Sequence, residues 1–250
     1  MSRTKIEWCD YTINPIKGLC PMACSYCYAR AMSKRFKWNT EIRFNPRWWA
    51  DVDSRKPRRY FVGSTMELFG EWIPDEWIEN ILYRARLMDA HIFIFLTKQP
   101  QNLRKWSPFP DNCWVGVSAT NAETTYTAMD ELSKVNATVK FISFEPLLSQ
   151  INGGECEGER LDGLKYAGIN WVIIGRQTPA SKKTEPKVEW IKEIVEAADK
   201  AHVPVFLKDN LFPLLEGHNE DPWVENPWAF TEIGHNSFDY MYGLRQEFPR

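Results

Sequence analysis

The sequence predicts an α/β fold in which a parallel sheet curls into a partial barrel. Short apolar runs rich in β-branched and aromatic residues recur along the chain, and stretches with helical spacing separate them. Runs that are apolar almost throughout are typical of strands buried on both faces of a parallel sheet. The chain has 250 residues, which fits one domain with one sizeable core. An open doubly wound sheet is the alternative, because the same alternation of strands and helices builds both.

The strands and helices are predicted from the apolar pattern in chain order. A weaker run at Tyr11–Pro15 precedes six stronger runs, which are Tyr60–Gly63, Ile92–Thr97, Trp114–Ser118, Lys140–Phe144, Trp171–Gly175 and Val203–Leu207. Apolar residues at helical spacing predict crossover helices over Pro74–Met88 and Val188–Ala201. We therefore expect six or seven parallel strands joined by helices.

Two segments depart from this repeat. Residues 149–165 are rich in Gly and Glu and are predicted to form a loop insertion. We expect residues 1–215 to form the barrel domain and residues 216–250 to form an aromatic C-terminal extension packed on it. Its large side chains are Trp223, Trp228, Phe230, Phe238, Tyr240 and Tyr242. Packing on the barrel is their favoured role, and a lid over a pocket is the alternative.

Composition and charge exclude several classes of protein. Lys and Arg number 31 against 33 Asp and Glu, a net charge of -2, so the chain lacks the positive field of a dedicated duplex-binding protein. Hydrophobic residues make up 44% and charged residues 26%, which excludes wholesale disorder and collagen-like structure. The four histidines are too scattered for a mononuclear zinc hydrolase, and no glycine-rich nucleotide-binding loop occurs.

The sequence also predicts the compartment. The segment Met1–Trp8 has no apolar stretch of the kind that a secretion signal needs, and no apolar run is long enough to span a bilayer. We therefore expect a cytoplasmic protein with no membrane partner and with reduced thiols. Clustered cysteines in such a protein suggest metal binding.

Three cysteines are clustered in one short loop after the first predicted strand. Cys20, Cys24 and Cys27 are spaced as C-x3-C-x2-C. In a cubane cluster of four irons, three protein thiolates leave one iron free to bind another molecule. A structural zinc site completed by a fourth cysteine is the alternative, with Cys9, Cys113 or Cys156 as that ligand.

Polar residues follow the predicted strands, where parallel α/β folds bind their ligands. In chain order, these residues are Ser64–Glu67, Thr97, Lys98, Ser118, Asn121, Glu145, Arg176, Gln177, Lys208 and Asp209. They form a predicted rim of mixed charge.

The cysteine spacing, with Tyr26 directly before the last cysteine, resembles the signature of the radical S-adenosylmethionine (SAM) superfamily. The resemblance implies a partial (β/α)6-type TIM barrel and a 4Fe–4S cluster on Cys20, Cys24 and Cys27. The open iron would bind SAM, and one electron from a donor such as flavodoxin or ferredoxin would cleave SAM to methionine and a 5′-deoxyadenosyl radical.

The resemblance also implies three residues that bind SAM. Glu67 matches the position that contacts the amino group, although the usual Gly-Gly-Glu form is absent; capping of the following helix is its alternative role. Ser118 resembles the residue that reaches the ribose or the carboxylate, and Tyr26 would help to seat the adenine.

Longer phrases are similar to those of a family of small phage-type radical SAM proteins. They are Thr4-Lys-Ile-Glu-Trp8, Asn14-Pro15, Cys27-Tyr-Ala29, Phe61-Val-Gly-Ser-Thr-Met-Glu-Leu-Phe69, Leu96-Thr-Lys98, Val115-Gly-Val-Ser118, Ser143-Phe-Glu-Pro-Leu147 and Phe206-Leu-Lys208. The resemblance runs from about Thr4 to Asp209, and the short C-x3-C interval marks a subgroup. The closest characterised subgroup is queuine lyase, which implies release of queuine from a queuosine nucleoside or its 5′-phosphate for salvage.

This resemblance implies roles for the rim. Glu145 or Asp209 would accept hydrogen bonds from a guanine-like edge, and Lys208 and Arg176 would bind a 5′-phosphate. Asn14 is a further expected substrate contact, and Glu145, Lys208 and Asp209 are the expected catalytic residues. A rim ion pair is the alternative role of Glu145, and Lys208 and Asp209 could equally pair with neighbours.

Two other functional classes stay open on the sequence alone. A radical enzyme acting on a base in DNA or RNA would need a basic track around the rim, and the near-neutral charge disfavours it. A non-catalytic iron–sulfur or zinc module would neither bind nor cleave SAM, and the three-ligand loop disfavours that class.

Overall fold

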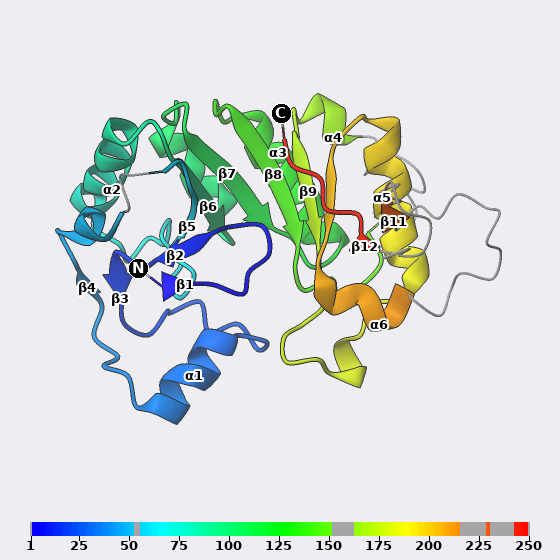
Figure 1. Cartoon of the computed structure of the whole chain (residues 1–250), viewed down its shortest axis with the longest axis horizontal. Helices are drawn as coiled ribbons and strands as arrows, with labels where there is room; N and C mark the ends of the chain where they lie inside the picture. The colour runs from blue at the N-terminus through cyan, green and yellow to red at the C-terminus, as the bar shows by residue number, and fades with distance from the viewer. Residues whose placement is uncertain (1, 53–55, 152–162, 216–228, 231–242, 250) are drawn as a thin grey trace.

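The structure is a computed structural model, and it describes residues 2–52, 56–151, 163–215, 229–230 and 243–249 (Figure 1). Its centre is one sheet in which seven parallel strands lie side by side in chain order. These strands are β2 (Tyr11–Ile13), β5 (Arg59–Val62), β6 (Ile92–Thr97), β7 (Cys113–Ser118), β8 (Val139–Phe144), β9 (Trp171–Ile174) and β10 (Val205–Leu207). The short strand β1 (Ser2–Arg3) extends the sheet antiparallel to β2.

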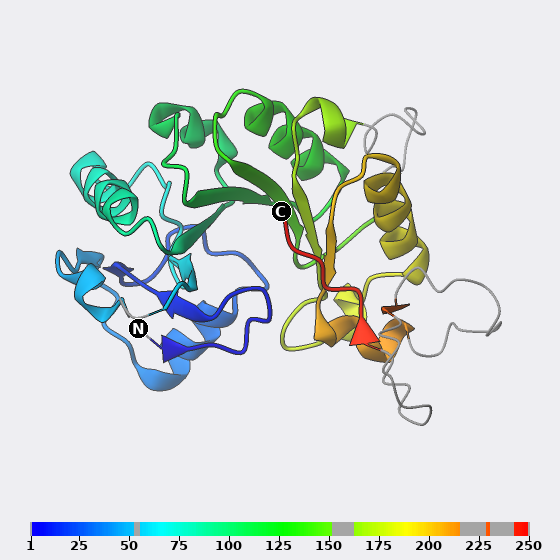
Figure 2. The ribbon, with the colours of Figure 1, turned by 45° about the horizontal axis from the view of Figure 1, so that its top comes forward.

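The sheet curls into half a barrel, with helices on its convex side (Figure 2). Every strand predicted from the sequence is present, including the weaker run at Tyr11, so the parallel strands number seven rather than the six of a (β/α)6 barrel. A doubly wound sheet reverses its strand order at a switch point. The order here never reverses, so the doubly wound alternative is wrong.

The two predicted crossover helices are confirmed to within one residue at each end. They are α2 (Asp75–Leu87) and α5 (Val188–Lys200), and the third long outer helix is α3 (Ala122–Ser133). Each buries an apolar stripe against the sheet. Asn121 begins α3 with a capping box, in which its side chain accepts from the backbone N–H of Thr124.

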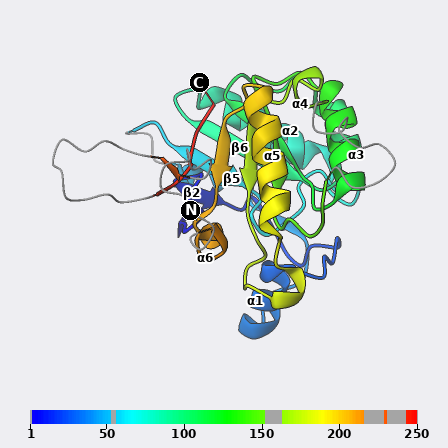
Figure 3. The same ribbon diagram turned by 90° about the vertical axis from the view of Figure 1, so that its right-hand side faces the viewer.

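Shorter elements flank the sheet. The helices are α1 (Tyr28–Phe36), α4 (Gly163–Tyr166) and α6 (Phe212–Leu215), the strands are β3 (Ile16–Lys17), β4 (Arg43–Phe44), β11 (Ala229–Phe230) and β12 (Gly243–Leu244), and the 3-10 helices are η1 (Trp48–Asp51), η2 (Pro100–Trp106), η3 (Lys182–Thr184) and η4 (Asp209–Leu211). Figure 1 and Figure 3 show α1 and α6 toward the end of the molecule at which the parallel strands finish. In the part of the chain that the structure describes, no helix is long and apolar enough to cross a bilayer.

Alternation along the strands creates two apolar cores. One lies between the sheet and the outer helices. The other lies inside the curl and is built from aromatic rings around Trp171, which contacts Trp8, Trp114, Phe141 and Phe206 at ring distances of 5.4 to 6.5 Å. This inner core fills the amino-end half of the half-barrel, so the polar rim occupies the opposite, carboxyl end.

The described end of the C-terminal extension packs against the amino end of the half-barrel. Phe248 lies 5.5 Å from Trp171, and the Arg59 guanidinium lies 3.9 Å from the centre of the Phe248 ring. The Trp171 indole donates a hydrogen bond to the Glu247 carbonyl at 2.8 Å. The segment runs antiparallel along β10, so Phe248 lies at the opposite end from the rim while Gln246 reaches the carboxyl end of β10. The predicted aromatic residues of the extension lie outside the described side chains, as does most of the predicted insertion at 149–165.

Candidate active site

The cysteine loop lies across the carboxyl ends of β5 and β6. Residues 18–27 connect β3 to α1, and the Tyr28 hydroxyl at the start of α1 donates to the Ser64 carbonyl at 2.7 Å. The Gln99 side chain donates to the Met22 sulfur at 3.2 Å. Because Ser64 and Gln99 follow β5 and β6, the loop is held over the end of the barrel at which ligands bind.

All three loop thiols are free and partly exposed. Cys27 begins α1, and its sulfur accepts a hydrogen bond from the Arg30 backbone N–H at 3.4 Å. The Arg30 side chain donates to the Cys20 carbonyl at 2.6 Å, which ties the start of the loop to the helix. These two contacts hold both ends of the cysteine loop against the first turn of α1.

Tyr26 and Cys20 adjust the electrostatics of this loop. The Tyr26 hydroxyl interacts with Cys24, and burial together with the nearby thiols raises the pKa of Tyr26 to about 12, so the phenol is neutral. Burial also raises the pKa of Cys20, although the backbone N–H groups of Glu67 and Met22 oppose that shift. The interaction with the Glu67 N–H places the Cys20 sulfur beside the segment that follows β5.

The thiols are of the kind that binds an iron–sulfur cluster, but they are not gathered around one point. Across the described residues, no group of three or more His, Cys, Asp or Glu side chains is gathered to hold a metal ion. Cys20 and Cys27 line one pocket of about 10 Å³, which is room for at most a single water molecule. Three thiols in one loop are the donors that such clusters take, and the pocket that two of them share is too small for a cluster.

The structure describes two of the three candidate fourth ligands of the zinc alternative, and both are buried. Cys113 is the first residue of β7, at the amino end, and is buried between the sheet and the helices. Cys9 is buried in the inner core. Cys156 lies outside the described residues.

Glu67 links two strand ends. Its carboxylate accepts from the Thr97 hydroxyl at 2.6 Å, from the Lys98 backbone N–H at 2.7 Å and from the Phe69 backbone N–H at 3.2 Å. The alternative role of capping α2 is wrong, because Pro74 occupies that position without a side-chain cap. The Glu67 side chain is buried, and these three protein donors already occupy most of the acceptor sites of its carboxylate.

Asn14 has a similar role at the neighbouring strand β2. Its amide group exchanges hydrogen bonds with the Ser64 hydroxyl at 3.1 and 3.2 Å, and its carbonyl oxygen accepts from the Thr65 backbone and hydroxyl. Asn14 therefore positions the segment after β5, on which the Tyr28 hydroxyl rests.

An inward-facing polar layer lies above the aromatic core. Ser118 and Ser143 are paired in register on β7 and β8, and the Lys98 ammonium lies 3.3 Å from the Ser118 hydroxyl. Ser118 and Ser143 face inward because they lie two or four residues from the inner-core side chains of the same strands. The Ser143 hydroxyl is buried and has no hydrogen-bond partner among the described residues.

Lys208 is buried and forms the centre of a charged cluster in the same layer, with two partly exposed carboxylates around it. Its ammonium contacts the Glu145 carboxylate directly and lies 3.8 Å from Glu7 Oε2. Burial would lower the pKa of Lys208, but these carboxylates outweigh burial and leave the pKa raised, so the lysine is charged. Gly175 makes room for the cluster, since a Cβ there would lie 2.8 Å from the Lys208 side chain.

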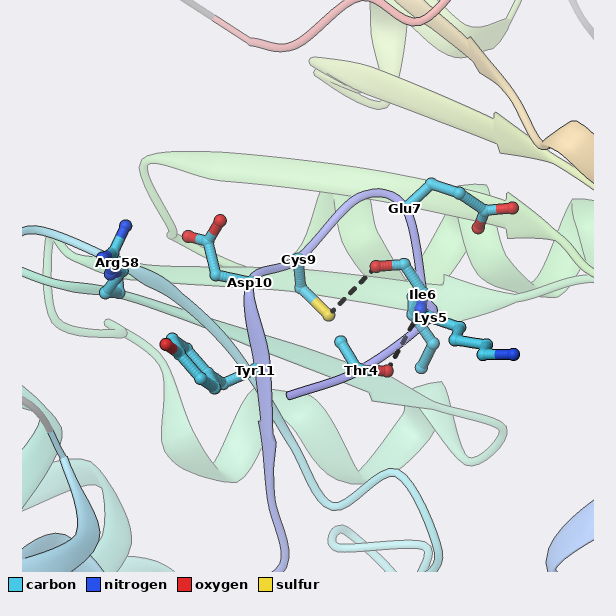
Figure 4. A pocket seen from close by; sticks show the side chains of 8 residues that line it. All are labelled: Thr4, Lys5, Ile6, Glu7, Cys9, Asp10, Tyr11 and Arg58. Atoms are coloured by element: carbon cyan, nitrogen blue, oxygen red, sulfur yellow. Dashed lines mark hydrogen bonds between the residues drawn. The ribbon is translucent and has the colours of Figure 1, made fainter. Parts of the chain in front are cut away.

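Glu7 reaches this cluster from the loop between β1 and β2. The neighbouring Trp8 anchors the loop, because its ring is buried 4.8 Å from Phe61 in the inner core. Figure 4 shows Glu7 and Cys9 on this loop, with the Cys9 thiol directed at the Ile6 carbonyl. The loop also borders a pocket of about 420 Å³ that extends to the start of β2 and β5, at the amino end of the strands. The residues that line it are Thr4, Lys5, Ile6, Glu7, Cys9, Asp10, Tyr11 and Arg58.

A family model matches the segment of the chain that contains the candidate site and most of the fold. Residues 3–211 match the model of the family described as Protein of unknown function (DUF5131). The chain belongs to the DUF5131 family. No curated protein matches this chain.

The DUF5131 site does not unite all the residues predicted for it. Arg176 pairs with Glu185 at 3.1 Å. Asp209 is exposed and accepts from the Gln246 side chain at 2.7 Å, away from the Lys208 cluster. Glu145 forms the ion pair that was its alternative role.

Four residues of the DUF5131 site were not singled out from the sequence as ligand-binding residues. They are Glu7, Tyr28, Lys98 and Ser143. Glu7 lies in the Thr4-to-Trp8 phrase and Ser143 in the Ser143-to-Leu147 phrase, so a signal existed for both. Tyr28 lies in the Cys27-to-Ala29 phrase and Lys98 in the Leu96-to-Lys98 phrase, and the position of Lys98 directly after β6 had also marked it as a rim residue.

Proposed function

We propose that this DUF5131 protein is a radical SAM lyase that releases queuine from queuosine or its 5′-phosphate. One observation carries the proposal: three free thiols in one loop lie over the carboxyl end of a half-barrel that also holds the buried Lys208–Glu145 pair. A cofactor-binding loop and a polar substrate layer at the same strand ends are what a barrel enzyme requires.

Cys20, Cys24 and Cys27 would hold a 4Fe–4S cluster. With SAM and one electron from a donor protein, such a cluster would supply a 5′-deoxyadenosyl radical able to remove a ribose hydrogen and so weaken the bond to the base. The chain supports this site in two ways. The Arg30 backbone N–H holds the Cys27 sulfur at the start of α1, and the neutral Tyr26 hydroxyl beside Cys24 adds no competing charge.

The substrate would meet the inward polar layer. The Glu145 carboxylate, already oriented by Lys208, is an acceptor for the N–H groups of a guanine-like edge. A 7-deazapurine lacks the N7 that hydrolases protonate to make the base leave. The aromatic core below the layer closes the amino-end half of the curl and keeps water from entering from that side.

An anaerobic assay tests the proposal. The full chain is reconstituted with iron and sulfide, then given a reductant and SAM, and 5′-deoxyadenosine and queuine are quantified by mass spectrometry with and without queuosine 5′-phosphate. We expect both products to rise together with substrate. Deoxyadenosine without queuine would remove queuosine as substrate, and a nucleic-acid substrate would be tested next. If protein with an intact cluster forms neither 5′-deoxyadenosine nor queuine, the proposal is overturned.

Matched cysteine variants separate the cluster from the fold. Cys24→Ala should lose the cluster and all cleavage of SAM, because two thiolates cannot replace three. Cys113→Ala should retain both, since Cys113 lies at the amino end of β7. Iron content and 5′-deoxyadenosine yield report the difference, and full activity in Cys24→Ala would contradict the assignment.

A further inference from the structure

Loop 4–10 adds the carboxylate of Glu7 to the inward-facing polar layer, whose other members lie on or directly after the parallel strands. Glu7 lies on this loop, and its Oε2 atom is 3.8 Å from the Lys208 ammonium. We propose that Glu7 is a specificity-determining residue that binds an ammonium group on the substrate, while Lys208 donates to a neighbouring carbonyl and Glu145 accepts from a base N–H. This inference rests on the proposed lyase function.

The charges around Lys208 do not balance. One ammonium and two carboxylates leave one negative charge uncompensated in the cluster. Lys208 is only 8% exposed and the side chains of Glu7 and Glu145 are 19% and 24% exposed, so solvent screens the cluster only in part. An uncompensated buried charge is unfavourable, and a ligand that brings a positive charge would remove the imbalance.

One oxygen of the Glu7 carboxylate lacks a hydrogen bond. Glu7 Oε2 is a buried atom with no hydrogen-bond partner among the described residues. Its ion pair with Lys208 is at a distance too long for a hydrogen bond. A buried acceptor of this kind is suited to an N–H donor supplied by a ligand.

The groups of the cluster complement those of queuine in number and kind. Lys208 is shared by the two carboxylates, so the cluster offers one donor and two acceptors. Queuine offers the complementary set, because its substituent amine, its O6 carbonyl and its N1–H group are donor, acceptor and donor. The amine is protonated at neutral pH, which matches it to the carboxylate with the unsatisfied oxygen.

The cluster is also held rigidly enough to discriminate between ligands. Trp8, next to Glu7, is 1% exposed, and its ring packs on Phe61 and Trp171. Gly175 leaves space for the Lys208 side chain beside Glu145. This packing restrains the backbone at Glu7, and a restrained carboxylate loses less entropy on binding an ammonium group.

Equilibrium binding tests this inference without radical chemistry. Queuine and unsubstituted 7-deazaguanine are titrated by calorimetry into the cluster-reconstituted full chain without reductant. We expect the wild type to prefer queuine, and Glu7→Gln to reduce that preference by roughly tenfold or more with little change for 7-deazaguanine. Glu79→Gln is the control, because Glu79 is an exposed carboxylate on the outer helix α2.

A pair of ligands makes the test independent of any variant's folding. In 7-aminomethyl-7-deazaguanine the ammonium is present, and N-acetylation removes its charge at nearly constant shape around the base. Wild-type protein should bind the acetylated compound at least roughly tenfold more weakly. Equal affinity for the two compounds, no binding of any of these bases, or an unchanged preference for queuine in folded Glu7→Gln would each overturn the inference.

The outcome is separable from that of the lyase assay. If the wild type releases queuine while Glu7→Gln keeps the queuine preference, the lyase function stands and the role of Glu7 is wrong. If Glu7→Gln loses the preference while the wild type releases no queuine, the ammonium-binding role stands and the lyase function is wrong.

Discussion

At the scale of single residues, Lys208 shows how this chain keeps a charge inside a barrel. Burying an ammonium is costly unless carboxylates and hydrogen bonds compensate for the lost water. Glu145 and Glu7 supply that compensation from opposite regions of the sequence. The surplus negative charge that results is what makes the cluster a candidate binding site rather than a closed ion pair.

Two buried thiols make the stability of the fold sensitive to alkaline pH. Burial raises the pKa of Cys9 and of Cys113 from 9.0 to about 12. Between these values the unfolded chain has lost the thiol protons while the folded chain retains them, so the free energy of unfolding falls as pH rises through this window. Below the lower value the thiols contribute nothing to the pH dependence.

Urea unfolding of wild type and Cys113→Ala at about pH 8 and about pH 10 tests this prediction. The wild type should lose about 1 kcal/mol more stability than the variant on going to the higher pH, because it carries one more buried thiol. Equal losses in the two proteins would contradict the prediction. Comparing each protein with itself removes the constant cost of the small cavity that the substitution leaves.

At the scale of elements, strand alternation decides which polar side chains enter the site. Phe206 of β10 belongs to the inner core, and Lys208, two residues later, faces the same side. Asp209 follows immediately and instead bonds to Gln246. Two adjacent polar residues after one strand therefore have different surroundings.

The packing of β7 against β8 depends on a glycine. A Cβ at Gly116 would lie 2.3 Å from the ring of Phe141 on the neighbouring strand. Gly116→Ala should reduce the free energy of unfolding by about 1–3 kcal/mol, because both strands are held by neighbours and the ring has no space to retreat.

Chemical denaturation of Gly116→Ala against Gly163→Ala measures this effect. At Gly163 the nearest atom to an added Cβ is the flexible Met129 sulfur at 3.3 Å. We expect that control to change stability by no more than about 0.5 kcal/mol. Similar stabilities for the two variants would show that the inner core yields more easily than its packing suggests.

At the scale of the whole molecule, two segments distant in sequence complete the half-barrel. Loop 4–10 inserts Trp8 into the inner core, and the segment 244–249 covers the amino end of the same core through Phe248. The charged cluster and the cysteine loop lie at the other end. Stability and ligand binding are thus concentrated at opposite ends of the strands.

Phe248→Ala should therefore destabilise the fold and spare the site. The ring contacts Trp171, Phe206 and the Arg59 guanidinium, and its loss should lower the free energy of unfolding by roughly 1–3 kcal/mol, less than a fully buried ring would cost. Thermal unfolding checks the loss, and cluster content after reconstitution is the readout expected to stay unchanged. An unaltered unfolding midpoint would contradict the prediction.

Much of the fold was predictable because its signals are local. Each apolar run from Tyr60 to Leu207 became a strand, and the helical spacing over Pro74–Met88 placed α2 to within a residue. The weaker run at Tyr11 is also a strand, since parallel pairing with β5 supplies what its own sequence lacks. The portion of the site that follows strand ends was predictable for the same reason.

The rest of the site depended on contacts that no local pattern encodes. Glu7 and Lys208 are at opposite ends of the family match and meet only in the fold. Asp209 directly follows Lys208, yet its side chain bonds to Gln246 instead of joining the cluster. Glu67 was identified as a ligand-binding candidate, yet its carboxylate joins β5 to β6. These outcomes follow from the curvature of the sheet and the parity of each strand.

The sequence by itself determined the α/β class, the order of strands and helices, and the grouping of three cysteines in one loop, because hydrophobic periodicity and residue spacing are properties of neighbouring residues. Only the tertiary structure decided that the sheet curls without reversing, that the cysteine loop lies over β5 and β6, and that Glu7 joins Glu145 at Lys208. The physical reason is that packing Trp8 and the strand side chains into one inner core brings together charges that are far apart along the chain.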